Sequence, residues 1–74
     1  MDPETVPVQG AVIRLGQLLK LVGVADSGAD ARSLLSEGEV TVNGETELRR
    51  GRQLTSGDLV VVALPAGQRT YRVE

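Results

Sequence analysis

The stretch EGEVTVNG, residues 37–44, marks the point at which the apolar period of the sequence changes. Val40 and Val42 alternate with polar residues, which is typical of a strand with one buried face. The Asn-Gly pair at 43–44 is a strong signal for a tight turn between two strands. Upstream of this stretch the apolar residues recur at helical spacing instead. The sequence therefore predicts a helical half followed by a stranded half.

Two short helices are expected in the upstream half. Over residues 14–22, one apolar face is formed by Leu15, Leu18, Leu19 and Val22. Gly23 then supplies a stop signal. Ser27 is a suitable N-cap for a second helix, which we expect to run to about Glu37 and to end before Gly38. Its buried face is predicted to consist of Ala31, Leu34 and Leu35.

The downstream half of the sequence predicts strands and turns. Residues 45–52 predict a short strand followed by an exposed basic loop, and residues 56–58 and 65–67 predict turns. Residues 59–64 are apolar on both faces, as expected of a strand that is covered on both sides. Residues 70–73 alternate and close the sheet. We therefore expect an α+β domain, with two short helices packed on a small antiparallel sheet of about four strands.

The length of 74 residues indicates one domain. Residues 1–10 contain Pro3, Pro7 and Gly10 among polar residues, and proline disfavours a regular helix. We expect a flexible N-terminal tail over 1–10, ending in a short strand near 8–13, and a single domain over 11–74.

Catalytic chemistry is largely excluded by composition. The chain has no Cys and no His, so thiolate, imidazole and most zinc chemistry is absent. No phosphate-loop motif is present, and the serines have no evident base partner. We expect no enzyme activity, cofactor, metal or small-molecule substrate. No apolar run reaches membrane length and no signal peptide is evident, so we expect a cytoplasmic protein that does not bind membranes.

The sharpest feature is a cluster of three arginines, Arg49, Arg50 and Arg52, in the predicted basic loop. Arginine forks match phosphate oxygens, although the net charge of −2 argues mildly against a nucleic-acid partner. Taken alone, the cluster favours a solvated loop that pairs with Glu45 and Glu47. Three further bases, Arg14, Lys20 and Arg32, lie off the apolar faces of the predicted helices.

A resemblance to a known family favours a functional role for the arginine cluster over a solvated loop. The block at 37–44, the basic segment at 47–52, the Gly-Asp pair at 57–58 and the leucine-rich first helix resemble the RNA-binding domain named after small-subunit ribosomal protein S-four. That domain is also called the alpha-L RNA-binding motif, and the chain is similar to its stand-alone bacterial YbcJ-like branch. The similarity runs from residue 13 to residue 62.

The resemblance implies binding of structured RNA, of the rRNA or tRNA class, by a basic surface of two helices and the arginine loop. Ribosome-associated proteins are a second expected class of partner. The residues implied as RNA-binding are Arg14, Lys20, Ser27, Gly28, Arg32, Arg49, Arg50 and Arg52. Many members have several bases in the second helix, where this chain has only Arg32. With a single aromatic residue, Tyr71, we expect weak, salt-sensitive contact with phosphates and shape rather than base stacking.

Two other functions remain open from the sequence. The first is a protein-interaction module on a ribosomal or RNA-modifying partner. The second, ranked lower, is a β-grasp sulfur carrier, which residues 42–45 and 57–60 would suit. Such carriers need a C-terminal Gly-Gly, whereas this chain ends Tyr-Arg-Val-Glu at 71–74 and begins with two helices.

Overall fold

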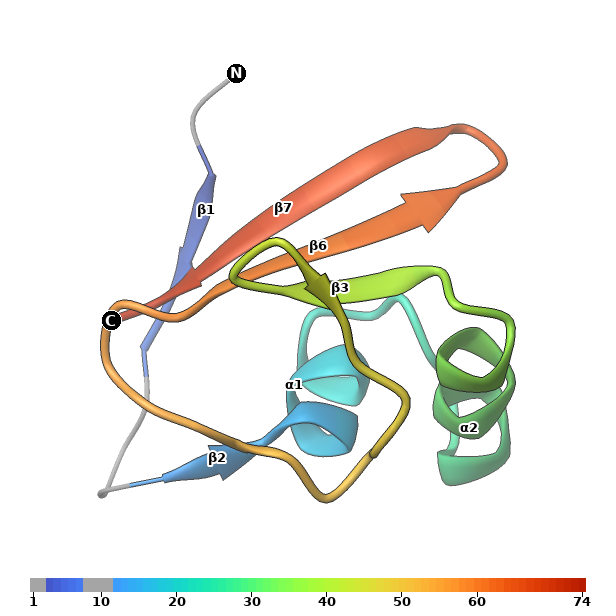
Figure 1. Ribbon diagram of the computed structural model, residues 1–74, viewed down its shortest axis with the longest axis horizontal. Helices are drawn as coiled ribbons and strands as arrows, with labels where there is room; N and C mark the ends of the chain where they lie inside the picture. The colour runs from blue at the N-terminus through green and yellow to red at the C-terminus, as the bar shows by residue number, and fades with distance from the viewer. Residues whose placement is uncertain (1–2, 8–11) are drawn as a thin grey trace.

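The computed structural model describes residues 3–7 and 12–74, in which two helices cover one face of a five-stranded sheet (Figure 1). The elements in chain order are β1 (Glu4–Val6), β2 (Ile13–Arg14), α1 (Leu15–Leu21), α2 (Gly28–Ser36), β3 (Val40–Val42), β4 (Glu45–Thr46), β5 (Gln53–Leu54), β6 (Leu59–Leu64) and β7 (Gly67–Val73). The main sheet has the order β1-β7-β6-β3-β4, and β2 pairs with β5 in a separate ribbon. The predicted α+β class is confirmed.

Both predicted helices are present, each shorter by a residue or so at its ends. In α1 the stripe of leucines at 15, 18 and 19 is fully buried. In α2 the hydroxyl oxygen of Ser27 accepts a hydrogen bond of 3.2 Å from the backbone N–H of Asp30, so Ser27 is the N-cap. Gly38 follows the C-cap with a φ of +75°, a conformation that favours glycine.

The predicted turn at 43–44 connects β3 and β4, and both of its residues have positive φ. Strand β6 pairs antiparallel with β3 on one side and with β7 on the other. The side chains between this sheet and the helices form one core. Its buried members are Val6, Leu15, Leu18, Leu19, Ala25, Ala31, Leu35, Val40, Val42, Leu54, Val60, Val62, Tyr71 and Val73.

The sheet differs from the prediction in its first strand. Residues 4–6, expected in the flexible tail, form β1, which pairs parallel with β7 and buries Val6. The main sheet is therefore mixed and has five strands. A three-residue strand between two prolines has too short a pattern to be recognised, and its partner lies at the other end of the chain. The remaining expected tail, and most of the strand expected near 8–13, lie outside the described residues.

The prediction that residues 59–64 are covered on both faces is wrong. Val60 and Val62 are fully buried, whereas Leu59, Val61 and Ala63 are only half-buried. Both helices lie on one side of the sheet (Figure 1), so the other face of β6 has no layer above it. Leu34 of α2, which was expected in the core, is also only half-buried.

Candidate functional site

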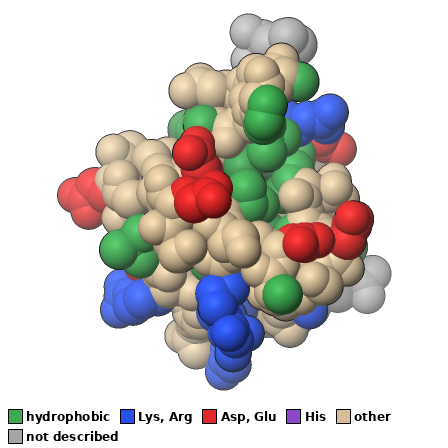
Figure 2. Space-filling view, turned by 90° about the vertical axis from the view of Figure 1, so that its right-hand side faces the viewer, with side chains coloured by type: hydrophobic (Ala, Val, Ile, Leu, Met, Phe, Trp, Pro, Cys, Tyr) green, Lys and Arg blue, Asp and Glu red, His purple; other side chains and the backbone are tan. Residues whose placement is uncertain are grey.

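Charged side chains are unevenly distributed over the surface. On the face shown in Figure 2, Lys and Arg side chains gather mainly toward the lower end, whereas an apolar area with acidic neighbours lies higher, beneath the β6–β7 hairpin. The surface of the described residues contains two separate hollows that share no lining residue. The first of them contains several of the predicted binding residues.

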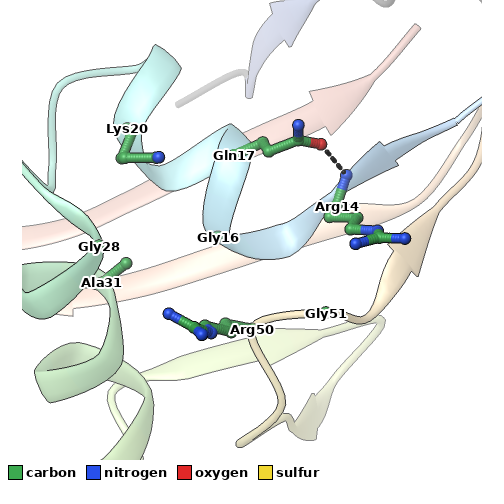
Figure 3. A pocket seen from close by; sticks show the side chains of 8 residues that line it. All are labelled: Arg14, Gly16, Gln17, Lys20, Gly28, Ala31, Arg50 and Gly51. Carbon is green, nitrogen blue, oxygen red and sulfur yellow. Dashed lines mark hydrogen bonds between the residues drawn. The ribbon is translucent and has the colours of Figure 1, made fainter.

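This first hollow, here named the basic pocket, has a volume of about 250 Å³ (Figure 3). It lies where the start of α1, the start of α2 and the loop before β5 meet. The residues that line it are Arg14, Gly16, Gln17, Lys20, Gly28, Ala31, Arg50 and Gly51. Four of these eight residues, Arg14, Lys20, Gly28 and Arg50, were predicted from the sequence to bind RNA.

Backbone hydrogen bonds hold the arginine loop against the start of α1. The N–H of Gly16 donates to the carbonyl oxygen of Arg50 at 2.9 Å, and the N–H of Leu15 donates to that of Arg52 at 2.8 Å. The β2–β5 pairing extends the same contact. A Cβ on Gly16 would lie 3.3 Å from both Cβ and O of Arg50, so a glycine permits this close approach.

Three cations surround the basic pocket. Arg14, Lys20 and Arg50 are exposed, and none of them forms an ion pair with an acid in the described residues. In Figure 3 the Arg50 side chain reaches toward the start of α2, where a Cβ on Gly28 would lie 3.9 Å from its Nη1 atom. The N-terminal end of a helix carries partial positive charge as well. The pocket therefore offers donors suited to an anion, with no acidic side chain in its lining.

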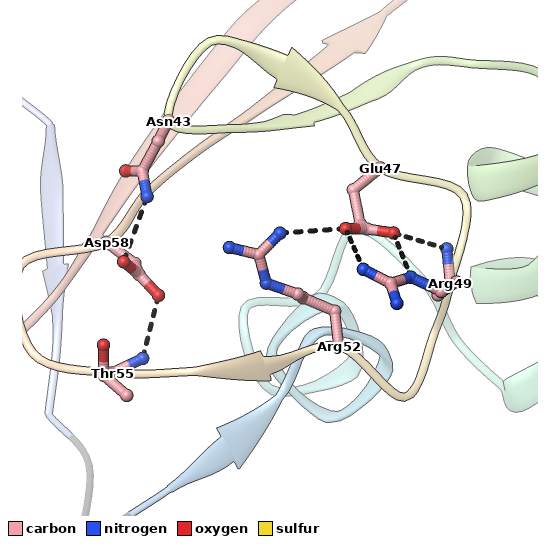
Figure 4. Close-up of polar contacts among 6 residues, drawn as sticks. All are labelled: Asn43, Glu47, Arg49, Arg52, Thr55 and Asp58. Atoms are coloured by element: carbon pink, nitrogen blue, oxygen red, sulfur yellow. Dashed lines mark hydrogen bonds and ion pairs between the residues drawn. The ribbon is translucent and has the colours of Figure 1, made fainter.

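The other two arginines of the cluster are engaged by a buried acid, Glu47 (Figure 4). Its Oε1 accepts hydrogen bonds from the backbone N–H of Arg49 at 3.1 Å and from Nε of Arg49 at 3.0 Å. Its Oε2 accepts from Nη1 of Arg52 at 2.9 Å and from Nη2 of Arg49 at 3.3 Å.

The hydrogen bonds from Arg49, and then the one from Arg52, lower the pKa of Glu47 from 4.5 to about 2. Glu47 is therefore ionised at neutral pH, and its charge offsets part of the charge of both arginines. Glu45, the other acid expected to pair with the loop, forms no ion pair in the described residues. Among the three clustered arginines, Arg50 alone lines the basic pocket.

The two remaining predicted residues lie apart from the pocket lining. Ser27 caps α2, and its hydroxyl oxygen is occupied by that role. Arg32 is exposed on α2 but does not line the pocket. Near the start of α2, the Asp30 carboxylate accepts a hydrogen bond from the backbone N–H of Asp26, which adds negative charge beside this surface.

Four residues of the pocket were not predicted from the sequence, namely Gly16, Gln17, Ala31 and Gly51. A signal existed for Gly16, because a glycine inside a helical pattern is unfavourable unless a neighbouring segment approaches closely. Gln17 also has a structural role, since its Oε1 accepts a hydrogen bond of 3.0 Å from the N–H of Arg14 at the start of α1 (Figure 3).

A second polar cluster connects two turns (Figure 4), and none of its residues lines the basic pocket. Nδ2 of Asn43 donates to Oδ1 of Asp58 at 3.1 Å, and Oδ1 of Asn43 accepts from the N–H of Leu59 at 2.9 Å. Partial burial acts to raise the pKa of Asp58, but hydrogen bonds from the Thr55 N–H and from Asn43 outweigh it and lower that pKa. This cluster stabilises the fold.

The part of the chain that the structure describes contains neither a membrane-spanning helix nor a cluster of metal ligands. None of its helices has the length and apolar character needed to span a membrane. Over residues 3–7 and 12–74, no group of three or more potential metal ligands is brought together. The polar side chains that line the basic pocket are those of Arg14, Gln17, Lys20 and Arg50, which supply guanidinium, amide and ammonium donors.

Comparison with known proteins identifies relatives along most of the chain. Residues 6–74 match a family described as "S4 domain". A Bacillus subtilis protein named "Probable ribosome maturation protein RlbA" is 47% identical over 57 residues, which cover 77% of this chain and 80% of that protein. An Escherichia coli protein named "Putative RNA-binding protein YbcJ" is 39% identical over 69% of this chain and 73% of its own length. A tyrosine–tRNA ligase of Burkholderia lata is 33% identical over 81% of this chain, but the match covers only 14% of the ligase.

Proposed function

This chain belongs to the S4 domain family, and we propose that it is a non-catalytic protein that binds structured RNA through the basic pocket. The main observation in support is that Arg14, Lys20 and Arg50 converge from three segments on one pocket whose lining contains no acid. The names of the relatives point the same way, since they refer to ribosome maturation, RNA binding and tRNA ligation. The proposed targets are therefore rRNA or tRNA in the cytoplasm, with ribosome-associated proteins as further partners.

The proposed mode of binding is contact with phosphates and with the shape of folded RNA. Arginine and lysine bind phosphate oxygens without reading the base sequence. Proteins that bind unpaired bases usually stack them on exposed aromatic rings. The only aromatic residue of this chain, Tyr71, is 1% exposed and cannot serve as such a platform.

The proposed roles of the arginines differ. Arg50 would contact phosphate directly, because its guanidinium lies in the pocket and has no carboxylate partner among the described residues. Arg49 and Arg52 would contribute less, because Glu47 offsets their charge and holds their side chains. We therefore expect few phosphate contacts, and binding that weakens strongly as salt is added.

The experiment that tests this function is a fluorescence anisotropy titration with labelled rRNA hairpins and tRNA at several salt concentrations. The pocket variants are Arg14→Gln, Lys20→Gln and Arg50→Gln. The matched controls are Arg69→Gln and Arg72→Gln, which remove the same charge from exposed positions on β7. We expect each pocket variant to weaken binding about fivefold or more and to reduce the salt slope by about 1, whereas the controls change both much less.

Two outcomes would contradict the proposal. The first is an absence of RNA binding by the unaltered protein at low salt. The second is an equal effect of pocket and control variants, which would show that only the overall charge matters. Circular dichroism spectra of every variant confirm that the fold is retained, so that a loss of affinity is not a loss of structure.

A further inference from the structure

A second hollow lies between the C-terminal end of α2 and the β6–β7 hairpin, with a volume of about 290 Å³. We name it the acidic groove. Its lining residues are Leu34, Glu37, Glu39, Ala63, Leu64 and Pro65, none of which lines the basic pocket. Figure 2 shows the apolar area beneath the hairpin, with acidic side chains beside it.

The floor of the acidic groove is apolar and only partly covered. Leu34, Ala63 and Leu64 are half-buried, and Pro65 is exposed. Leu34 lies at a position of α2 where the helical period predicts a core residue, yet it remains accessible from this groove. Burial of such side chains by a partner would be favourable, because apolar surface would be removed from water.

The walls of the acidic groove are held by backbone hydrogen bonds. The N–H of Glu39 donates to the carbonyl oxygen of Leu34 at 3.2 Å, and the N–H of Ala63 donates to that of Glu39 at 2.8 Å. These bonds connect the end of α2 to β6 through the intervening chain. The groove is therefore preformed, and a partner would not have to order it on binding.

Two carboxylates give the acidic groove its charge. Glu37 and Glu39 flank Gly38, and both line the groove. Neither forms an ion pair within residues 3–7 and 12–74, where the ion pairs found are those of Glu47. Two unpaired carboxylates beside an apolar floor complement a ligand that combines cationic and apolar side chains.

We propose that the acidic groove binds an extended protein segment in which an apolar side chain is flanked by lysine or arginine. The apolar side chain would contact Leu34 and Leu64, and the flanking cations would pair with Glu37 and Glu39. RNA is a poor occupant, since carboxylates repel phosphates. A second copy of this chain is the competing occupant, since its exposed Leu21 adjoins Lys20 and its exposed Leu48 adjoins Arg49, and the titration below separates it from a partner segment.

This proposal does not depend on RNA binding, because the acidic groove and the basic pocket share no residue. If both functions hold, one molecule can bind RNA at one site and a basic protein segment at the other. The domain would then connect the two partners, with no competition between them.

The test is a two-dimensional ¹H–¹⁵N NMR titration of the whole chain with a short synthetic peptide that alternates leucine with lysine and arginine. We expect saturable shift changes in the amides of residues 34–39, 63 and 64, whereas Pro65 has no amide N–H to report. Glu37→Gln/Glu39→Gln should weaken binding about fivefold, because two surface ion pairs are lost. The matched control, Glu45→Gln/Glu74→Gln, removes the same charge from exposed positions outside the groove and should bind as the unaltered chain does.

Peptide variants separate the apolar contribution to binding from the contribution of the ion pairs. A peptide with serine in place of leucine, and one with glutamate in place of the bases, should both bind much more weakly. Equal binding of the glutamate peptide, or an equal effect of the two double variants, would overturn the proposal. So would shift changes confined to the basic pocket. Shifts of the groove amides caused by an RNA hairpin alone, or by a change of protein concentration alone, would assign the groove to RNA or to a second copy instead.

Discussion

The backbone N–H of Gly16 donates a hydrogen bond of 2.9 Å to the carbonyl oxygen of Arg50. This bond joins the first turn of α1 to the arginine loop, although the two residues lie in different halves of the sequence. It places the side chain of Arg50 near the start of α2, in the same pocket as Lys20 (Figure 3). The basic pocket therefore depends on how closely the backbones at Gly16 and Arg50 approach each other.

We predict that Gly16→Ala lowers the stability of the fold. Alanine would gain about 0.5–1 kcal/mol over glycine in a helix. Its Cβ would lie 3.3 Å from two atoms of Arg50, and overpacking of this kind typically costs about 1–3 kcal/mol. We therefore expect the free energy of unfolding, measured by urea denaturation, to fall by about 1 kcal/mol. RNA binding should also weaken.

The control for this prediction is Gly51→Ala in the same loop. A Cβ there would meet nothing within 4 Å, and the φ of Gly51 is not in the left-handed region. We expect its stability to be unchanged or slightly raised. If Gly16→Ala is more stable than the unaltered protein, the close approach at Arg50 is not a constraint on the fold.

Glu47→Gln should destabilise the protein near neutral pH by about 1–3 kcal/mol, because hydrogen bonds to a charged group are lost. The pKa of Glu47 is about 2 in the folded state, below its ordinary value of 4.5. A lowered pKa means that the ionised side chain stabilises the fold fully above the ordinary value. This stabilisation is lost as the pH falls through the folded-state pKa.

The measurement is urea denaturation of the unaltered protein and of Glu47→Gln over a range of pH. The difference in the free energy of unfolding should be constant near neutral pH and should shrink below about pH 4.5. Glu45→Gln serves as the control and should show almost no difference, since Glu45 has no ion pair in the described residues. A difference that persists unchanged into strong acid would show that the charge of Glu47 is not what stabilises the loop.

Two substitutions at Asn43 should separate the contribution of its side-chain hydrogen bonds to stability from the cost of backbone strain. Asn43→Gly removes the bonds to Asp58 and Leu59 but tolerates the φ of +52°. Asn43→Ala removes the same bonds and adds strain in the left-handed region, so it should be the less stable of the two by up to about 1 kcal/mol. Thermal unfolding measures the order of stability. Both folded variants should bind RNA normally, and a selective loss of affinity would assign Asn43 to the binding surface.

Tyr71→Phe should leave the protein as stable as before or make it more stable. The ring is in the core, but its hydroxyl oxygen is buried without a hydrogen-bond partner among the described residues. A buried polar group without a partner costs about 1–3 kcal/mol, which phenylalanine avoids at nearly the same volume. Denaturation in urea measures the change. A clear loss of stability would reveal a partner for the hydroxyl group.

Much of the local structure could be predicted from the sequence, because it follows from backbone preferences of neighbouring residues. The spacing of the leucines predicted α1, and Ser27 predicted the start of α2. The Asn-Gly pair at 43–44 predicted the β3–β4 turn. The residues of the 37–44 block also carried the resemblance to the family. These features depend on interactions within a few residues, which a sequence pattern records directly.

The candidate site was only partly predictable. The sequence presented Arg49, Arg50 and Arg52 as one cluster, and nothing in their spacing distinguishes them. The structure separates them, because Glu47 folds back onto Arg49 and Arg52 while the loop directs Arg50 to the basic pocket. Which side chain meets which partner depends on the conformation of the whole loop.

The sequence by itself determined the two helices, the main turns and the family to which this chain belongs. The tertiary structure decided three other features: the pairing of β1 with β7, the meeting of Arg14, Lys20 and Arg50, and the exposure of Leu34 in the acidic groove. Each of these three features depends on contacts between segments that are distant along the chain. Their contacts arise from the packing of completed elements against one another, and the local preferences that a sequence pattern expresses do not specify that packing.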